Sequence, residues 1–129
     1  MEYCNHHGLP DIMMYGGDTT PWFITLEDED GKPLIPEAGD TYQCVLSIIP
    51  FGVTSGIGMY AMASTPSLQK IANFEDSGEG FYQAKLPFVT SDTMTLRGKY
   101  IYQIEVQSSG SNKVNQGKLT VLANINRKV

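Results

Sequence analysis

The stretch Gly98-Lys99-Tyr100-Ile101-Tyr102-Gln103-Ile104-Glu105-Val106-Gln107 decides the fold of this chain. At every second position it carries a large aromatic or aliphatic side chain, at Tyr100, Tyr102, Ile104 and Val106. Only an extended strand places such an alternation on two opposite faces. The aromatic and β-branched face needs a second sheet to cover it, whereas the other face can remain in water. The stretch is therefore predicted to be a central strand of a two-sheet β-sandwich.

The same period of two recurs in other segments, which are bounded by residues that favour turns. Strands are expected at 11–15, 22–26, 42–48, 82–86 and 113–122. A further strand at 68–73 has two alternative inward faces, either Leu68, Lys70 and Ala72 or Gln69, Ile71 and Asn73. The side chains expected in the core are Trp22, Ile24, Leu46, Leu86, Tyr102, Ile104 and Val121.

Length and composition favour one domain. The 129 residues include 13 glycines and 7 prolines, which suits short strands joined by turns. We expect a single domain over 11–122, a flexible leader over 1–10 and a polar tail over 123–129. The formal net charge of −5 disfavours nucleic acid as a partner, because phosphate backbones would be repelled. Since no apolar run reaches roughly 18 residues and no secretory signal is visible, we expect no membrane partner and a cytoplasmic site of synthesis.

Side chains that carry chemistry are few and poorly spaced for a reaction. Cys4, His6 and His7 lie in the leader, and no second ligand pair with a zinc spacing follows them. Because His6 and His7 are the only histidines, Ser-His or Cys-His catalysis would have to recruit the leader. The acidic run at 27–30 precedes Gly31 and is better explained as a hairpin turn than as a calcium site. We therefore expect a protein that is not an enzyme, with no catalytic residue, no metal site and no cofactor.

Two local features are predicted from short motifs. Residues 90–96 can form one helical turn, with Thr90 or Ser91 as its cap and Met94 packed onto the core. Gly117 lies inside a predicted strand and suggests a β-bulge there.

The segment at 51–66 is the least decided part of the sequence. Its three glycines favour a loop, whereas its apolar side chains are too many for an ordinary solvated loop. It is either an inter-strand connection covered by the domain itself or a contact surface covered by another subunit. We predict that it takes part in protein binding, through Phe51, Val53, Ile57, Met59, Tyr60 and Met62.

The order of these segments resembles an immunoglobulin-like sandwich. Residues 91–100 are similar to the corner before the sixth strand of such domains, where a tyrosine hydroxyl bonds the preceding turn. The resemblance implies that the Tyr100 hydroxyl bonds backbone near Ser91–Met94. The predicted strand at 98–107 has no cysteine, so the inter-sheet disulfide of antibody domains is not expected, and Cys44 is predicted to be a buried free thiol. The predicted fold class is all-β, a two-sheet antiparallel immunoglobulin-like β-sandwich.

A narrower resemblance rests on three motifs near the start of the chain, Gly17-Asp18-Thr19-Thr20, Ile24-Thr25-Leu26 and Asp28-Glu29-Asp30-Gly31-Lys32-Pro33. Together with the later stretches 81–86, 98–104 and 116–121, they are similar to the N-terminal domain of phage baseplate upper proteins. The resemblance covers roughly 16–122 apart from 51–73, where this chain has an apolar segment in place of a polar one.

This resemblance implies a non-enzymatic structural module of a phage or prophage tail. Its partners would be other tail or baseplate proteins, or a second copy of itself. Such a protein is made in the bacterial cytoplasm without a signal peptide and becomes part of the virion. The alternative is an immunoglobulin-like module that binds carbohydrate or protein through exposed aromatic side chains such as Trp22, Tyr60 or Tyr82.

Overall fold

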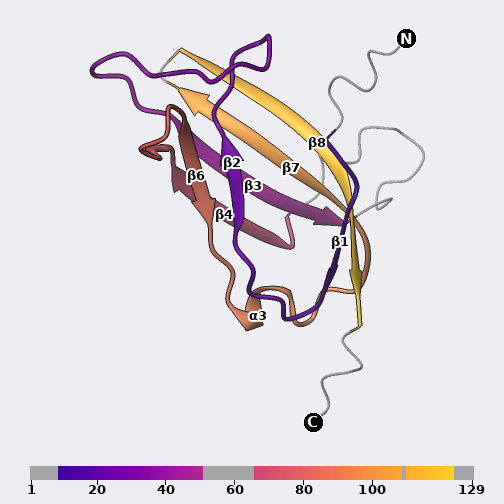
Figure 1. The fold of residues 1–129 in the computed structure, drawn as a ribbon. Helices are drawn as coiled ribbons and strands as arrows, with labels where there is room; N and C mark the ends of the chain where they lie inside the picture. Colours follow the sequence, from indigo (N-terminus) through magenta and orange to yellow (C-terminus); the bar gives the residue numbers. More distant parts are fainter. Residues whose placement is uncertain (1–8, 51–65, 109, 124–129) are drawn as a thin grey trace, which may run out of the picture.

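The computed structural model describes residues 9–50, 66–108 and 110–123, and these form two β-sheets (Figure 1). The strands are β1 (Ile12–Tyr15), β2 (Trp22–Thr25), β3 (Gln43–Pro50), β4 (Leu68–Asn73), β5 (Glu75–Asp76), β6 (Tyr82–Leu86), β7 (Gly98–Ser108) and β8 (Ser111–Leu122). A single helical turn, α3 (Thr90–Thr93), connects β6 to β7. The described part of the chain contains no helix long and apolar enough to span a lipid bilayer. The predicted all-β fold with two sheets is confirmed.

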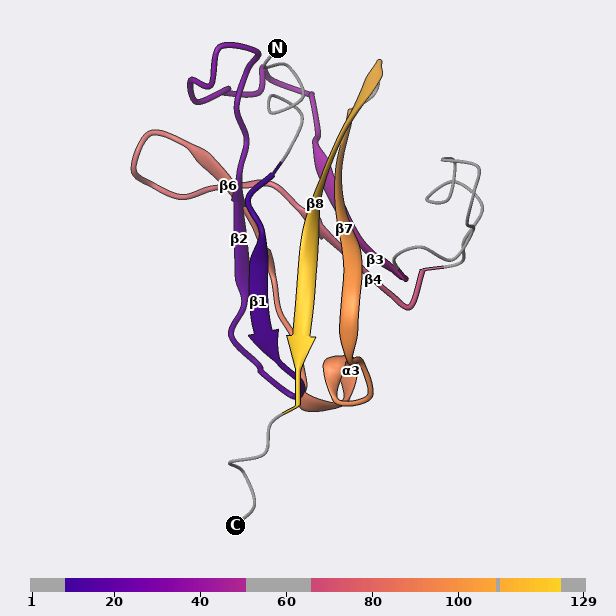
Figure 2. The same cartoon turned by 90° about the vertical axis from the view of Figure 1, so that its right-hand side faces the viewer.

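The two sheets differ in width. The larger sheet has five strands in the order β1-β8-β7-β3-β4, and the smaller has three in the order β2-β6-β5. Among the described strands, all pairs are antiparallel except one, because β1 runs parallel to β8 (Figure 2). The prediction of an entirely antiparallel sandwich is therefore wrong at this pair. An alternating pattern specifies which face of a strand is buried, but not which neighbour the strand finds or in which direction it runs.

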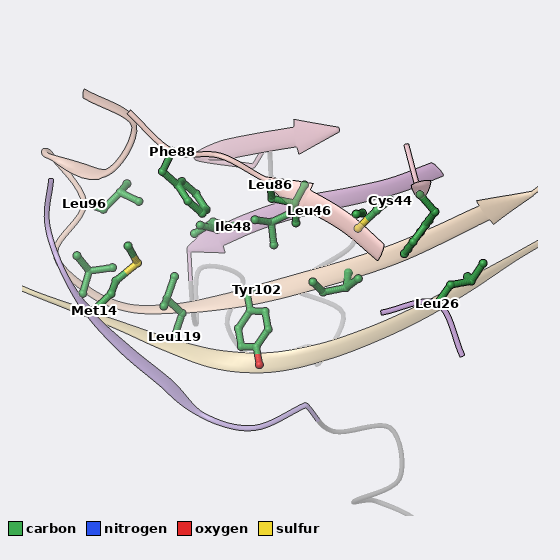
Figure 3. Packing of buried hydrophobic residues seen from close by; sticks show 14 residues of the cluster. Met14, Leu26, Cys44, Leu46, Ile48, Leu86, Phe88, Leu96, Tyr102 and Leu119 are labelled. Atoms are coloured by element: carbon green, nitrogen blue, oxygen red, sulfur yellow. The ribbon is translucent and has the colours of Figure 1, made fainter. Parts of the chain in front are cut away.

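Side chains from both sheets meet in one hydrophobic core (Figure 3). Tyr102 of β7, Leu46 of β3 and Leu86 of β6 are each at most 2% exposed. Among the predicted core residues, the buried ones are Leu46, Leu86, Tyr102, Ile104 and Val121. Trp22 and Ile24 are half-buried and pack against this cluster. The core prediction thus holds at its centre and weakens along β2, which is an edge strand of the smaller sheet.

The two alternatives for the inward face of β4 are resolved. Leu68 and Ala72 pack against the core, whereas Ile71 pairs with Val45 on the opposite face and is 58% exposed. Lys70 lies on the core side, and its Nζ reaches the carboxylate of Asp92 at 2.7 Å. β4 therefore presents its Leu68, Lys70 and Ala72 face inward.

One end of the core is closed by α3 and the turn after β1 (Figure 1). Thr93 is fully buried, and its Oγ1 accepts a hydrogen bond of 2.9 Å from the backbone N–H of Gly17. Leu96, just after α3, is 7% exposed and belongs to the core cluster. Met94 is 49% exposed, so the prediction that Met94 packs onto the core is wrong. A single turn has no extended apolar stripe from which the inward residue could be read.

The cap of α3 also differs from the predicted one. The carboxylate of Asp92 accepts a hydrogen bond of 2.8 Å from the backbone N–H of Val89, which precedes the helix. Neither Thr90 nor Ser91 supplies the cap. The same carboxylate pairs with Lys70, and both contacts hold the pKa of Asp92 below its usual value, the Lys70 contact more strongly.

The acidic run after β2 forms a turn, as predicted. Glu27 and Pro33 form an isolated antiparallel bridge. Inside this bridge, Oδ1 of Asp28 accepts hydrogen bonds from the backbone N–H groups of Asp30 at 2.8 Å and Lys32 at 3.0 Å. The carboxylate of Asp28 is thus used to hold the turn.

Candidate functional site

The six residues predicted to bind a partner lie outside the described part of the chain. They are Phe51, Val53, Ile57, Met59, Tyr60 and Met62, all within the undescribed range 51–65. Their role in protein binding stays a prediction.

Side chains with reactive groups do not gather into a site among the described residues. No group of three or more His, Cys, Asp or Glu side chains there could hold a metal ion. Cys44 is a buried free cysteine, as predicted, and burial raises the pKa of its thiol to about 11. A thiol that stays protonated is a poor nucleophile. The candidate site among the described residues is therefore a hollow of the surface and not a cluster of reactive groups.

An apolar groove opens between β2 of the smaller sheet and the β7–β8 hairpin of the larger one. Its volume is about 410 Å³. β2 contributes Trp22 and Ile24, and β7 contributes Tyr102, Ile104 and Val106. Leu9, Pro10 and Ile12 line the groove beside them, as do Lys113 and Asn115 of β8. The groove thus exposes part of the core-facing surface of both sheets.

The groove is open because the narrower sheet does not cover all of the wider one. β8 runs from Ser111 to Leu122, but β1 pairs with it only at Leu119–Leu122. The backbone N–H of Leu9 adds one hydrogen bond of 2.8 Å to the carbonyl of Gln116. On the opposite sheet, β6 is the one strand paired with β2. Two strand edges of the described fold therefore border the same groove.

The side chains on the inner face of β8 change from polar to apolar between the groove and the core. Lys113 and Asn115 line the groove, whereas Leu119 and Val121 are buried in the core. Gly117 lies between the two regions. The alternating set along one face of β8 is thus polar where the groove is open and apolar where the second sheet covers it.

Gly117 leaves room for the Tyr102 side chain at the base of the groove, a role that the sequence alone does not indicate. A Cβ on Gly117 would lie 2.7–2.8 Å from atoms of the Tyr102 side chain, which occupies the space above it. Gly117 pairs with Tyr102 in the regular register of β7 and β8, so the predicted β-bulge is wrong. Glycine is needed here because the tyrosine ring lies against this position of the strand. Close approach of another group is, besides a β-bulge, a reason for glycine in a strand interior.

Tyr102 connects the base of the groove to the segment that precedes β1. Its hydroxyl donates a hydrogen bond to the carbonyl of Pro10. Its ring meets the ring of Trp22 edge to face at a centroid distance of 5.4 Å, and Trp22 meets Phe88 in the same way. Burial, with a smaller effect from the nearby Asp11 carboxylate, raises the pKa of Tyr102 to about 12. The base of the groove is therefore a fixed aromatic arrangement.

Tyr100 makes the other tyrosine contact, at a different place from the predicted one. Its hydroxyl accepts a hydrogen bond of 3.0 Å from the backbone N–H of Arg97. The prediction of a bond near Ser91–Met94 is wrong, although a backbone bond exists. The chain turns at Gly98, whose φ is +94°, and the amide immediately before this turn is the one within reach.

An acidic cleft adjoins one end of the groove. Four consecutive carboxylate residues at 27–30 line it, and among its described lining residues Lys113 is the basic one. Glu27, Val106 and Lys113 line both hollows, so the two are continuous at this end. The site as a whole pairs an apolar channel with a negatively charged end.

Two of the aromatic side chains named for carbohydrate binding are described. Trp22 meets Tyr102 and Phe88 edge to face, and Tyr82 is half-buried against the core. Tyr60 lies outside the described residues. Stacking on sugars uses an open aromatic face, and two aromatic neighbours contact the ring of Trp22.

Comparison of this chain with protein-family models, with curated proteins and with solved structures finds no match.

Proposed function

We propose that this protein is a non-enzymatic assembly module of a phage or prophage tail, and that it docks to a neighbouring protein through the groove between β2 and the β7–β8 hairpin. The observation that carries the docking role is the groove itself, where half-buried Trp22, Ile24 and Val106 remain accessible beside two strand edges. Aromatic and aliphatic side chains in a concave surface are the usual anchors of protein interfaces.

Strand order supports an immunoglobulin-like assignment of the fold. The order β1-β8-β7-β3-β4 in one sheet and β2-β6-β5 in the other is compatible with the two sheets of such domains. The phage role is supported by the resemblance of the motifs at 17–20, 24–26 and 28–33 to the opening of baseplate upper proteins. The partner is then another tail protein.

The proposal is tested by co-expression of the chain with the proteins encoded beside its gene, followed by size-exclusion chromatography with light scattering. We expect a stable complex with one of these proteins. The variant Asn115→Arg places a long charged side chain in the groove without removing a core residue, and we expect it to weaken the complex at least about tenfold. The control is Asn112→Arg, because Asn112 is exposed on the opposite face of the same strand.

Neighbouring genes that encode no tail, holin or lysin proteins would contradict the phage role. A complex that Asn115→Arg leaves intact would contradict docking through the groove. Circular dichroism of both variants establishes that each retains the β-sheet fold.

A further inference from the structure

We propose that the groove receives an extended segment of the partner protein, which adds as a strand to the edge of β8, turns apolar side chains at alternate positions into the groove, and carries a basic residue at the end beside Glu27–Asp30. This inference rests on the proposed docking function and specifies the chemistry of the partner.

The backbone of β8 offers the pairing groups. The carbonyls of Gln116 and Leu122 both accept hydrogen bonds from the segment at 9–16, so even-numbered residues of β8 turn their backbone groups away from β7. By the same alternation, the N–H and C=O groups of Asn112 and Val114 face this outer edge. In the described part of the chain, no backbone group pairs with them there. Unpaired edge groups are a template for another strand.

The groove offers the side-chain sites. A strand added beside β8 points every second side chain to the inner face of the larger sheet, because strand side chains alternate. That face leads into the groove, where Ile24, Ile104 and Val106 stand. Peptide recognition by strand addition combines these two elements, since main-chain pairing gives affinity and pockets for alternate side chains give specificity.

Charge determines which end of the partner segment carries a cation. Four carboxylate residues at 27–30 line the adjoining cleft, where Lys113 is the one lysine among the described lining residues, and the whole chain has a net charge of −5. A lysine or arginine on the partner complements this end, and an acidic residue there would be repelled. Since Lys113 is the third residue of β8, which begins at Ser111, the basic residue lies near the start of that strand.

The sequence before Leu9 does not supply such a segment. Its residues include Glu2 but no lysine or arginine, so it lacks the basic residue that the acidic end of the groove favours. A partner of the stated chemistry fits the groove better than this part of the chain itself.

The test uses synthetic peptides of roughly eight residues that alternate threonine with leucine or valine. One peptide ends in lysine, a second begins with lysine so that both strand directions are sampled, and a matched pair has glutamate in place of lysine. Trp22 is the single tryptophan of the chain and lines the groove, so its fluorescence reports binding directly. We expect one lysine peptide to bind at least about tenfold more tightly than its glutamate counterpart.

The variant Val114→Pro distinguishes backbone pairing with the edge of β8 from binding of the peptide side chains in the groove alone. Proline removes the N–H group that faces the open edge, while the pairing of β8 with β7 uses the alternate residues and remains possible. We expect a loss of affinity for the lysine peptide of about tenfold or more, whereas Val114→Thr, which keeps the N–H group, stays within about twofold. If Val114→Pro does not fold, Asn115→Arg serves as the blocking variant, and protection of the Val114 amide from hydrogen exchange on peptide binding replaces the proline readout.

Equal affinity of Val114→Pro and Val114→Thr, or no amide protection at Val114, would overturn strand addition. No binding of any alternating peptide would overturn it as well, as would tighter binding of a peptide that copies residues 1–8. If light scattering shows that two copies of the chain associate, and Val114→Pro abolishes this association, the edge of β8 serves self-association and not partner binding. A tail-protein complex that survives Val114→Pro and is lost with Asn115→Arg keeps the proposed function and rejects strand addition. Survival with both variants rejects groove docking altogether.

Discussion

The two halves of the inner face of β8 lie in different surroundings. At the closed end, Leu119 is fully buried and Val121 is 2% exposed, and both belong to the core cluster. At the open end, Lys113 and Asn115 line a groove that the smaller sheet leaves uncovered. One strand thus serves as part of the core over one half and as part of a surface over the other. The unequal widths of the two sheets, and no change of secondary structure, therefore create the candidate site.

The largest difference between the two halves is expected from matched truncations. Leu119→Ala removes a fully buried side chain and leaves a cavity, so we expect a loss of about 2–5 kcal/mol in the free energy of unfolding. Asn115→Ala, at the groove, is expected to change it by less than about 0.5 kcal/mol. Urea denaturation followed by Trp22 fluorescence measures both. Similar losses for the two variants would show that the groove half of β8 is as well covered as the closed half.

Gly117 lies at the boundary, and its substitution tests how firmly the base of the groove is held. A Cβ there meets Tyr102, whose hydroxyl and ring are both engaged, so we expect Gly117→Ala to cost about 2 kcal/mol. Gly110→Ala is the control, since no atom lies within 4 Å of a Cβ at that position. A neutral Gly117→Ala, measured by the same denaturation, would mean that the Tyr102 ring moves aside freely.

Thr93 tests the closed end through a single polar contact. Thr93→Val keeps the shape of the side chain but removes the acceptor of the buried Gly17 N–H, so we expect a loss of about 1–2 kcal/mol. Thr95→Val, which changes an exposed residue just after α3, should be nearly neutral. The thermal unfolding midpoints of the two variants measure this difference in stability. Equal midpoints would indicate that another group satisfies the Gly17 amide.

The smallest expected effect concerns the ion pair between β4 and α3. Because the folded-state pKa of Asp92 is lowered, its contribution to stability is present above the ordinary carboxyl pKa and is lost as the pH falls through the folded-state value. Asp92→Asn should therefore cost less than about 1 kcal/mol at pH 7, and this cost should be smaller near about pH 3. Glu79→Gln, in an exposed turn, is the control for removing one carboxylate from the surface. A loss for Asp92→Asn that is the same at both pH values would assign the effect to the Val89 hydrogen bond instead of charge.

The strands and the centre of the core could be predicted because alternation is a local property. Tyr102 and Ile104 are inward whatever strands lie beside them, and the same holds for Leu46 and Leu86. The parallel pairing of β1 with β8 could not be predicted this way, because a period of two is the same in either direction. Contacts of single side chains were predicted least well, as for Met94 and the Tyr100 hydroxyl, since they depend on which distant backbone group is nearest.

The groove was not predicted, although the sequence holds a trace of it. Apolar alternation marks Trp22 and Ile24 as inward side chains, but it gives no measure of how wide the covering sheet is. The polar residues Lys113 and Asn115 share the inner face of β8 with Leu119, and this switch within one strand is the available signal. The predicted binding residues at 51–62 are not tested by the described fold.

The parallel pairing of β1 with β8 has a mechanical consequence. A pulling force applied at the start of β1 and at the end of β8 acts in opposite directions along two adjacent strands, so the hydrogen bonds that join Ile12–Tyr15 to Leu119–Leu122 are loaded together in shear. Bonds loaded together resist extension better than bonds that are unzipped one after another. Single-molecule stretching through these two points should therefore meet a higher rupture force than stretching through the β7–β8 turn and the end of β8, which peels a hairpin open from one side. In a particle whose parts transmit tension, the first four-residue strand would act as the mechanical clamp of the domain.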